Sequence, residues 1–132
     1  MNRKGFTLIE LMAVITILVI ISLIIIPIID KNLKKSKDDM YKVQIENIRM
    51  AGEEFFFDNI SSRPDVGDYC FISLDSLVRQ GYISADVVNP KTGQSFDYIY
   101  VQIKNSGSDR NVFSYLVCPI EDGCESVILN CM

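Results

Sequence analysis

The most constraining feature of the chain is a nearly uninterrupted apolar run close to its start. From Phe6 to Ile29 the only charged side chain is Glu10. About 20 apolar residues in helical form cross a hydrocarbon layer, so this run is long enough to span a membrane. A carboxylate inside such a segment is disfavoured unless it has a partner, and Glu10 therefore predicts an interaction with a cation.

The residues before the run indicate what that cation is. Met1 to Gly5 is a short, positively charged leader, and Gly5-Phe6 is a small-to-bulky junction that a protease can recognise. Cleavage there creates an amino terminus at Phe6, with a pKa of about 8 and hence largely cationic at neutral pH. Within one helix this amine lies about 6 Å from Glu10 along the axis, and an offset neighbouring chain brings its own amine equally close. An intermolecular pair would specify the register between subunits.

The segment Gly5-Phe6-Thr7-Leu8-Ile9-Glu10-Leu11 resembles the class III processing and assembly signature of type IV pilins and pseudopilins. The resemblance implies that a prepilin peptidase cleaves after Gly5 and N-methylates Phe6. It also implies that Glu10 pairs with the terminal amine of an adjacent subunit in a filament. Further implied partners are other copies of the chain, the membrane before assembly, an assembly platform protein and ATPase-driven machinery. Weaker similarity continues through residues 81–83 and 89–93.

Two plainer interpretations of the apolar run are a secretory signal peptide and a simple anchor. A signal peptide ends in a small-x-small cleavage site, whereas this run ends at Pro27-Ile28-Ile29-Asp30. A charge near the end of a membrane segment also costs less than the roughly 2.5 to 3.5 kcal/mol expected at its centre. The complete Gly-Phe-Thr-Leu-Ile-Glu string favours the pilin interpretation over both.

The charges that flank the run give opposing signals about orientation. Arg3 and Lys4 favour a cytoplasmic N-terminus, while Lys31, Lys34, Lys35 and Lys37 beyond the other end favour the reverse. The pilin resemblance and the cysteine content place the C-terminal domain outside the cell. We therefore expect a single-pass precursor in the cytoplasmic membrane and then a filament on the cell surface.

The fold class predicted for the chain is α+β. Residues 1–5 are the leader, 6–29 the membrane or filament-core helix, 30–59 its amphipathic continuation, and 60–132 a globular head with an αβ-loop and an antiparallel sheet of three to four strands. Pro27 predicts a kink or an unwound turn, because proline lacks a donor and clashes with the preceding turn. In the continuation, apolar residues recur at three- and four-residue steps and predict a buried face: Tyr41, Ile45, Ile48, Gly52, Phe55 and Phe56. Gly52 on this face would allow a sheet to approach closely.

In the head, residues 61–68 are predicted to be a loop and a short helix to follow. Ser73 is placed to cap that helix and Gly81 to end it. Three strands are predicted at 96–104, 112–118 and about 125–129, forming an antiparallel meander. The first of these is apolar on both faces, so one face should pack on the long helix. The other would be a contact surface or be covered by a loop.

Four cysteines in a small extracytoplasmic domain suggest two disulfides, for which three connectivities are possible. If residues 119–123 join two strands, Cys118 and Cys124 flank the loop and can face each other, which leaves Cys70 for Cys131. A Cys₄ zinc site is the alternative, although the chain lacks any Cys-x-x-Cys pair. Free thiols in a reducing habitat are the third possibility, after disulfides and a zinc site.

The composition favours a structural role over catalysis. The chain of 132 residues contains no histidine, and no nucleophile motif is recognisable, so no catalytic residue, cofactor or metal is predicted. Glu121, Asp122 and Glu125 supply too few ligands for more than a weak calcium hypothesis. The formal net charge of −4 argues against a general nucleic-acid surface. We expect a subunit of a type IV pilus-like filament, with a competence or secretion pseudopilin or an adhesive minor pilin as alternatives.

Two hypotheses from other classes remain open at this point. The first is a membrane-anchored binding module that does not polymerise, and the second is an anchored hydrolase. Filaments in sheared surface material would distinguish the subunit from both.

Overall fold

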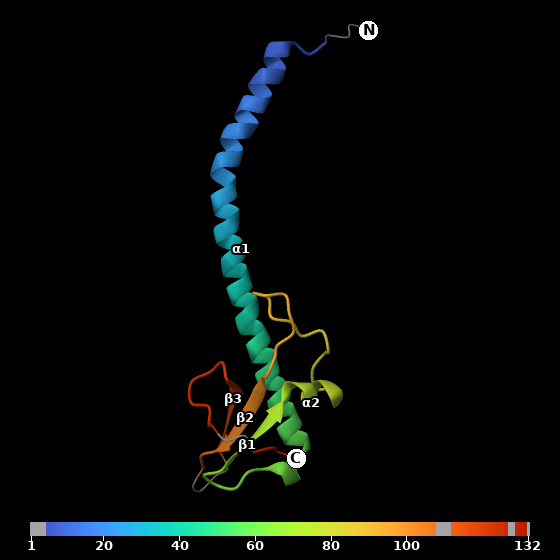
Figure 1. The fold of residues 1–132 in the computed structure, drawn as a ribbon, viewed down its shortest axis with the longest axis vertical. Helices are drawn as coiled ribbons and strands as arrows, with labels where there is room; N and C mark the ends of the chain where they lie inside the picture. Colours follow the sequence, from blue (N-terminus) through green and yellow to red (C-terminus); the bar gives the residue numbers. More distant parts are fainter. Residues whose placement is uncertain (1–4, 108–111, 127–128, 132) are drawn as a thin grey trace. The chain divides into compact units, whose positions relative to one another are not determined.

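The computed structural model describes residues 5–107, 112–126 and 129–131. Its elements in chain order are α1 (Leu8–Asp58), a 3-10 turn (Ile60–Ser62), β1 (Tyr69–Ser73), α2 (Leu74–Arg79), β2 (Tyr100–Asn105) and β3 (Phe113–Cys118) (Figure 1). The chain forms two compact units, Met1–Asp38 and Asp39–Met132. The predicted α+β class is confirmed: a long apolar helix is followed by a three-stranded antiparallel sheet.

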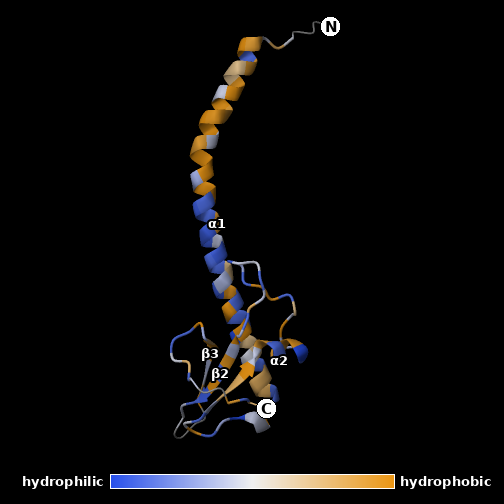
Figure 2. Ribbon diagram, viewed as in Figure 1, coloured by the Kyte–Doolittle hydropathy of each residue, from blue (hydrophilic) through white to orange (hydrophobic). Residues whose placement is uncertain are grey.

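The described part of the first unit consists mainly of the N-terminal part of α1. Its side chains from Leu8 to Ile29 are exposed, and Figure 2 shows this stretch as almost uniformly hydrophobic. It is the one helix in the described residues that is long and apolar enough to cross a membrane. Nothing within its own unit buries these side chains.

Pro27 lies inside α1 and does not end it. The ring of a proline clashes with the carbonyl of the residue four positions earlier, here Leu23. The helix nevertheless continues through this position, so the predicted unwound turn is not observed. The kink at Pro27 stays a prediction.

In the second unit, the C-terminal part of α1 supplies one layer of the core and the sheet supplies the other. The buried residues of α1 are Ile45, Ile48, Ala51, Gly52, Phe55 and Phe56, and Tyr41 packs at their edge. The predicted buried face is therefore confirmed. A Cβ atom on Gly52 would lie 2.6 to 2.9 Å from three side-chain carbons of Val101, so only glycine admits the sheet at this distance.

The sheet has the order β1-β2-β3, with both pairs antiparallel. Cys70 of β1 lies opposite Ile103 of β2, and Val101 of β2 lies opposite Val117 of β3. The predictions of strands within 96–104 and 112–118 are confirmed. The first strand starts later than predicted, because Tyr98 has a positive φ that interrupts the extended backbone.

The prediction of a third meander strand at about 125–129 is wrong for the described part of that segment, and β1 was missed. The C-terminal segment runs instead along β1, where Asn130 forms a parallel bridge with Phe71. The amide of Phe71 donates to the carbonyl of Leu129 at 2.6 Å, and the amide of Cys131 donates to the carbonyl of Phe71 at 3.0 Å. The tail is therefore bound at the opposite edge of the sheet from β3.

The short helix α2 follows the predicted pattern. Ser73 is its N-cap, and the Ser73 hydroxyl accepts a hydrogen bond from the amide of Ser76 at 3.2 Å. Gly81 follows with a φ of +83°, a conformation that favours glycine at helix ends. Leu74 and Leu77 form the buried face of this helix.

The sheet face away from α1 is covered in part by the loop after β3. Gln102 is fully buried, its Oε1 accepts from the amide of Glu125 at 2.7 Å, and its Nε2 donates to the carbonyl of Gly123 at 3.4 Å. The sequence left open whether this face is a contact surface or is covered by a loop, and at Gln102 it is covered by a loop. Tyr98 and Tyr100 lie outside this cover.

Candidate functional site: the start of helix α1

The candidate site consists of Gly5, Phe6 and Thr7, which precede α1, and Glu10 in its first turn. Gly5 has no heavy atom within 4 Å of the position that a Cβ would take, and the Phe6 side chain is 83% exposed. Both residues are therefore exposed in the part of the chain that the structure describes. The leader residues before Gly5 lie outside the described residues.

Thr7 and Glu10 form a reciprocal cap on the first turn. The amide and the hydroxyl of Thr7 both donate to Glu10 Oε2 at 2.9 Å, and the amide of Glu10 donates to Thr7 Oγ1 at 3.4 Å. This is the capping-box arrangement, in which a threonine and a glutamate three residues later satisfy each other's backbone amides. Glu10 therefore stabilises the first turn of the helix in addition to carrying the charge.

The cap uses one carboxylate oxygen of Glu10. Both donors from Thr7 reach Oε2, and Oε1 accepts no hydrogen bond from the residues that the structure describes. An ionised carboxylate offers about four acceptor positions in total. Glu10 can thus keep its cap and still accept a cation from outside.

The remaining polar side chains of the apolar stretch are satisfied within the helix. The hydroxyl of Thr16 donates to the carbonyl of Met12, and that of Ser22 donates to the carbonyl of Leu18, each at 2.7 Å. Such bonds remove the cost of carrying a hydroxyl into lipid. From Leu8 to Ile29, Glu10 is therefore the one charged side chain, and its charge has no cationic partner within this stretch.

Comparison with known families addresses this segment directly. Residues 1–26 match the family model described as the prokaryotic N-terminal methylation motif. The chain thus carries the signal that the Gly5-to-Leu11 segment predicted from its resemblance to type IV pilins. No curated protein and no solved structure matched the chain.

The cysteines form two disulfides, Cys70–Cys131 and Cys118–Cys124. These are the pairs put forward from the sequence, and no cysteine is left free. The zinc and free-thiol alternatives do not describe this structure, because every cysteine sulfur is bonded to another cysteine sulfur. The first disulfide joins β1 to the C-terminal tail, and the second closes the loop after β3.

The weak calcium hypothesis at residues 121–125 is not supported by the structure. Arg49 pairs with the carboxylate of Glu121, whose Oε2 also accepts from the amide of Val117 at 2.6 Å. Lys104 pairs with Glu125 at 3.0 Å. Within the described ranges, no cluster of three side chains is placed to hold a metal ion.

Sequence reasoning missed Thr7, although its signal was present. A threonine three residues before a glutamate at the head of an apolar run is a recognisable capping box. It also missed Arg49, which joins the long helix to the loop after β3 through Glu121. No local pattern marks that pair, because the two residues are 72 positions apart.

Proposed function

We propose that this chain is the membrane-stored precursor of a structural subunit of a type IV pilus-like extracellular filament. Cleavage after Gly5 and methylation of Phe6 convert it to the assembling form. The observation that carries the proposal is the match of residues 1–26 to the N-terminal methylation motif. The lone carboxylate of Glu10, with one oxygen open, supports the same function.

In the proposed polymer, the apolar part of α1 leaves lipid and packs against the same part of neighbouring subunits. This transfer exchanges one dry environment for another, so the hydrophobic effect by itself sets no register. A buried charge without a partner is strongly penalised, whereas a matched pair is tolerated. Pairing of Glu10 with the Phe6 amine of a neighbour therefore selects one offset between subunits.

The open environment of Gly5 and Phe6 supports processing at that junction. A prepilin peptidase needs an extended, accessible backbone, and α1 begins three residues after Gly5. Cleavage also removes Arg3 and Lys4, whose charges would oppose a second cation beside Glu10. Assembly then requires a platform protein and an ATPase-driven machine, with the C-terminal domain outside the cytoplasm.

The proposed role is structural and not enzymatic, and one experiment tests it. Surface material is sheared from cells that express the chain, examined by electron microscopy, and the chain is analysed by mass spectrometry. We expect filaments that contain a chain starting at Phe6 and heavier by one methyl group. A chain that still starts at Met1 and never occurs in a multimer would contradict the proposal.

A further inference from the structure

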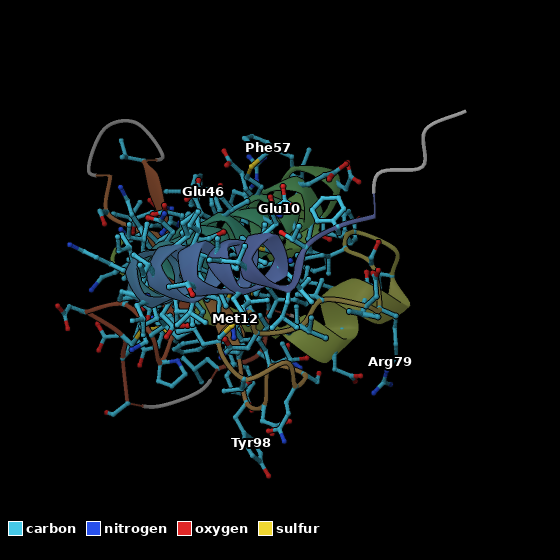
Figure 3. The ribbon with its side chains drawn as sticks, turned by 90° about the horizontal axis from the view of Figure 1, so that it is seen from above. Glu10, Met12, Glu46, Phe57, Arg79 and Tyr98 are labelled. Atoms are coloured by element: carbon cyan, nitrogen blue, oxygen red, sulfur yellow. A yellow bond between two sulfur atoms is a disulfide. The ribbon has the colours of Figure 1, made fainter. Side chains whose placement is uncertain are left out.

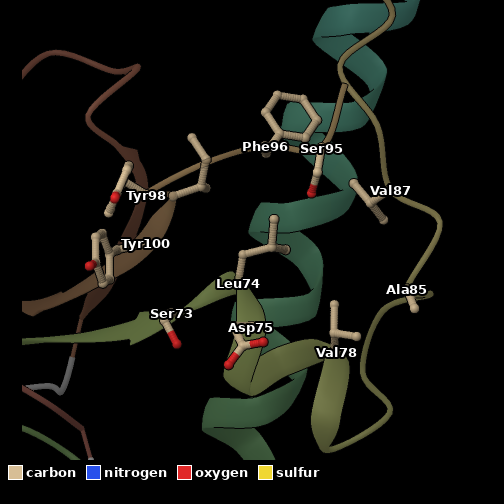
Figure 4. A pocket seen from close by; sticks show the side chains of 11 residues that line it. Ser73, Leu74, Asp75, Val78, Ala85, Val87, Ser95, Phe96, Tyr98 and Tyr100 are labelled. Atoms are coloured by element: carbon tan, nitrogen blue, oxygen red, sulfur yellow. The ribbon is translucent and has the colours of Figure 1, made fainter. Parts of the chain in front are cut away.

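A hollow in the second unit lies between the start of α2 and the segment that leads into β2. Its volume is about 360 Å³. The side chains that line it come from residues 73–78, 85–87 and 95–100, and the set is Ser73, Leu74, Asp75, Val78, Ala85, Val87, Ser95, Phe96, Tyr98, Ile99 and Tyr100. In Figure 4, Tyr98 and Tyr100 lie on one side of this hollow and Ala85 and Val87 on the other.

Tyr98 is held in an unusual conformation at the rim. Its φ is +56°, in the left-handed region that bulky residues rarely adopt, and its side chain is 84% exposed and projects outward in Figure 3. Such a conformation persists only where the surrounding structure fixes it, and it is concentrated at ligand sites. An exposed tyrosine in this state has no packing role that would justify the strain.

The neighbours of Tyr98 supply that fixation. Ile99 is buried, and its carbonyl accepts from the amide of Leu74 at 3.0 Å. Phe96 packs on Tyr41 of α1 with ring centroids 6.0 Å apart. The backbone is thus anchored on both sides of Tyr98, so the ring is presented at a defined place.

The chemistry of the lining selects a neutral, amphipathic ligand. Among the described residues that line the hollow there is no lysine or arginine, which disfavours an anion. The single carboxylate, Asp75, pairs with Arg79, which reduces its attraction for a cation. The lining combines apolar carbons of Leu74 and Val87 with the hydroxyls of Ser95 and the two tyrosines, so a ligand with both a C–H face and a set of hydroxyls fits best.

We propose that this hollow binds a neutral saccharide of one or two rings, with a sugar face stacked on Tyr98 and its hydroxyls bonded to Asp75 and Ser95. Tyrosine suits this role because it combines an apolar ring with a polar tip. The volume is within the range of about 300 to 1,000 Å³ that is usual for small-ligand sites. This binding function goes beyond the proposed structural role and does not depend on it.

The test uses the full chain in detergent micelles and saturation-transfer NMR. The probes are lactose, maltose and chitobiose, with choline chloride as a cationic probe. We expect transfer to at least one disaccharide, and Tyr98→Ala should weaken that binding about tenfold, the scale of one lost aromatic contact. Asp75→Asn should weaken it as well, since an amide has fewer acceptor positions than a carboxylate to share between Arg79 and a sugar hydroxyl.

Phe57→Ala is the matched control, because Phe57 is an exposed aromatic residue outside the lining. It should leave saccharide binding unchanged. Absence of transfer to all three disaccharides, equal binding by Tyr98→Ala, or transfer only to choline would each overturn the inference. Filaments are counted in the same strains; their loss in Tyr98→Ala without any saccharide binding would assign the hollow to a contact between subunits instead.

Discussion

The N-terminal and C-terminal parts of α1 belong to one helix but obtain their stability from different sources. From Leu8 to Ile29 the apolar side chains are exposed, and none is buried by its own unit. From Ile45 to Phe56 the same helix buries one face against its own sheet. Under the proposed function the first part depends on lipid or on another subunit, while the second depends on contacts within the chain. Substitutions should accordingly affect assembly in the first part and unfolding in the second.

The largest effect is expected at Glu10, and it falls on assembly. Glu10→Ala and Glu10→Gln should both abolish sheared filaments at normal subunit abundance, because losing one partner of a buried charge pair costs about 3 to 5 kcal/mol. Glutamine can still complete the cap with Thr7, since capping boxes use either residue. Electron microscopy and immunoblots of sheared fractions measure the outcome. Normal filaments from Glu10→Gln would show that capping, and not charge, is what assembly requires.

The next effect concerns the second unit and compares its two disulfides. Cys70–Cys131 spans 61 residues and Cys118–Cys124 spans 6. The loop-entropy relation gives about 4 kcal/mol for the first and about 2 kcal/mol for the second. Denaturant unfolding of the full chain in detergent, with each pair changed to serine, measures both. An equal loss of unfolding free energy for the two pairs would indicate that native contacts, and not loop length, determine how much each disulfide stabilises the protein.

A third substitution tests the contact between α1 and the sheet. Gly52→Val should lower the free energy of unfolding by about 1 to 3 kcal/mol, because the added carbons overlap with Val101. Val101→Ala in the same chain should recover part of that loss, as expected for residues in contact. Glu54→Ala, at an exposed position of the same helix, is the matched control and should change little. An unchanged free energy of unfolding in Gly52→Val would mean that the sheet can move away from α1 without a cost in stability.

The smallest effect is a pH dependence of the second unit. Burial, and then the charge of Glu53, raises the pKa of Tyr115 above its ordinary value of about 10. The neutral ring is thus favoured in the folded state, so its contribution is complete below pH about 10 and is lost as the pH rises through the folded pKa. Unfolding free energy should fall above pH about 10, and less steeply in Tyr115→Phe. Identical alkaline slopes for the two proteins would exclude Tyr115 as a cause.

The sequence predicted those parts of the fold that follow from local chemistry. The buried face of α1, the role of Gly52 and the cap at Ser73 each depend on spacing within a few residues. The strand at Tyr69–Ser73 was missed because it is short and next to a loop-forming segment. The prediction for the C-terminal tail was wrong because the position of the tail depends on pairing between Phe71 and Asn130, which are far apart in sequence.

The candidate site was predictable for a related reason. Gly5, Phe6 and Glu10 lie within six residues, so a linear motif contains the whole arrangement. The hollow beside Tyr98 combines three separate segments, and its key feature is a backbone angle that tyrosine seldom adopts. Composition and periodicity carry no signal for that angle.

The disulfide between Cys70 and Cys131 holds the C-terminal tail on β1, and this limits where a label can be attached to the protein. Under the proposed processing, a tag at the amino end would be removed with the leader, and one at the carboxyl end would follow directly on the tail residues bound along β1. The exposed turn around Val66 offers a better insertion point. A short epitope placed there would leave the processing junction untouched, and it would test the hydrogen bond from the Gly67 amide to the carbonyl of Asn105 at the end of β2.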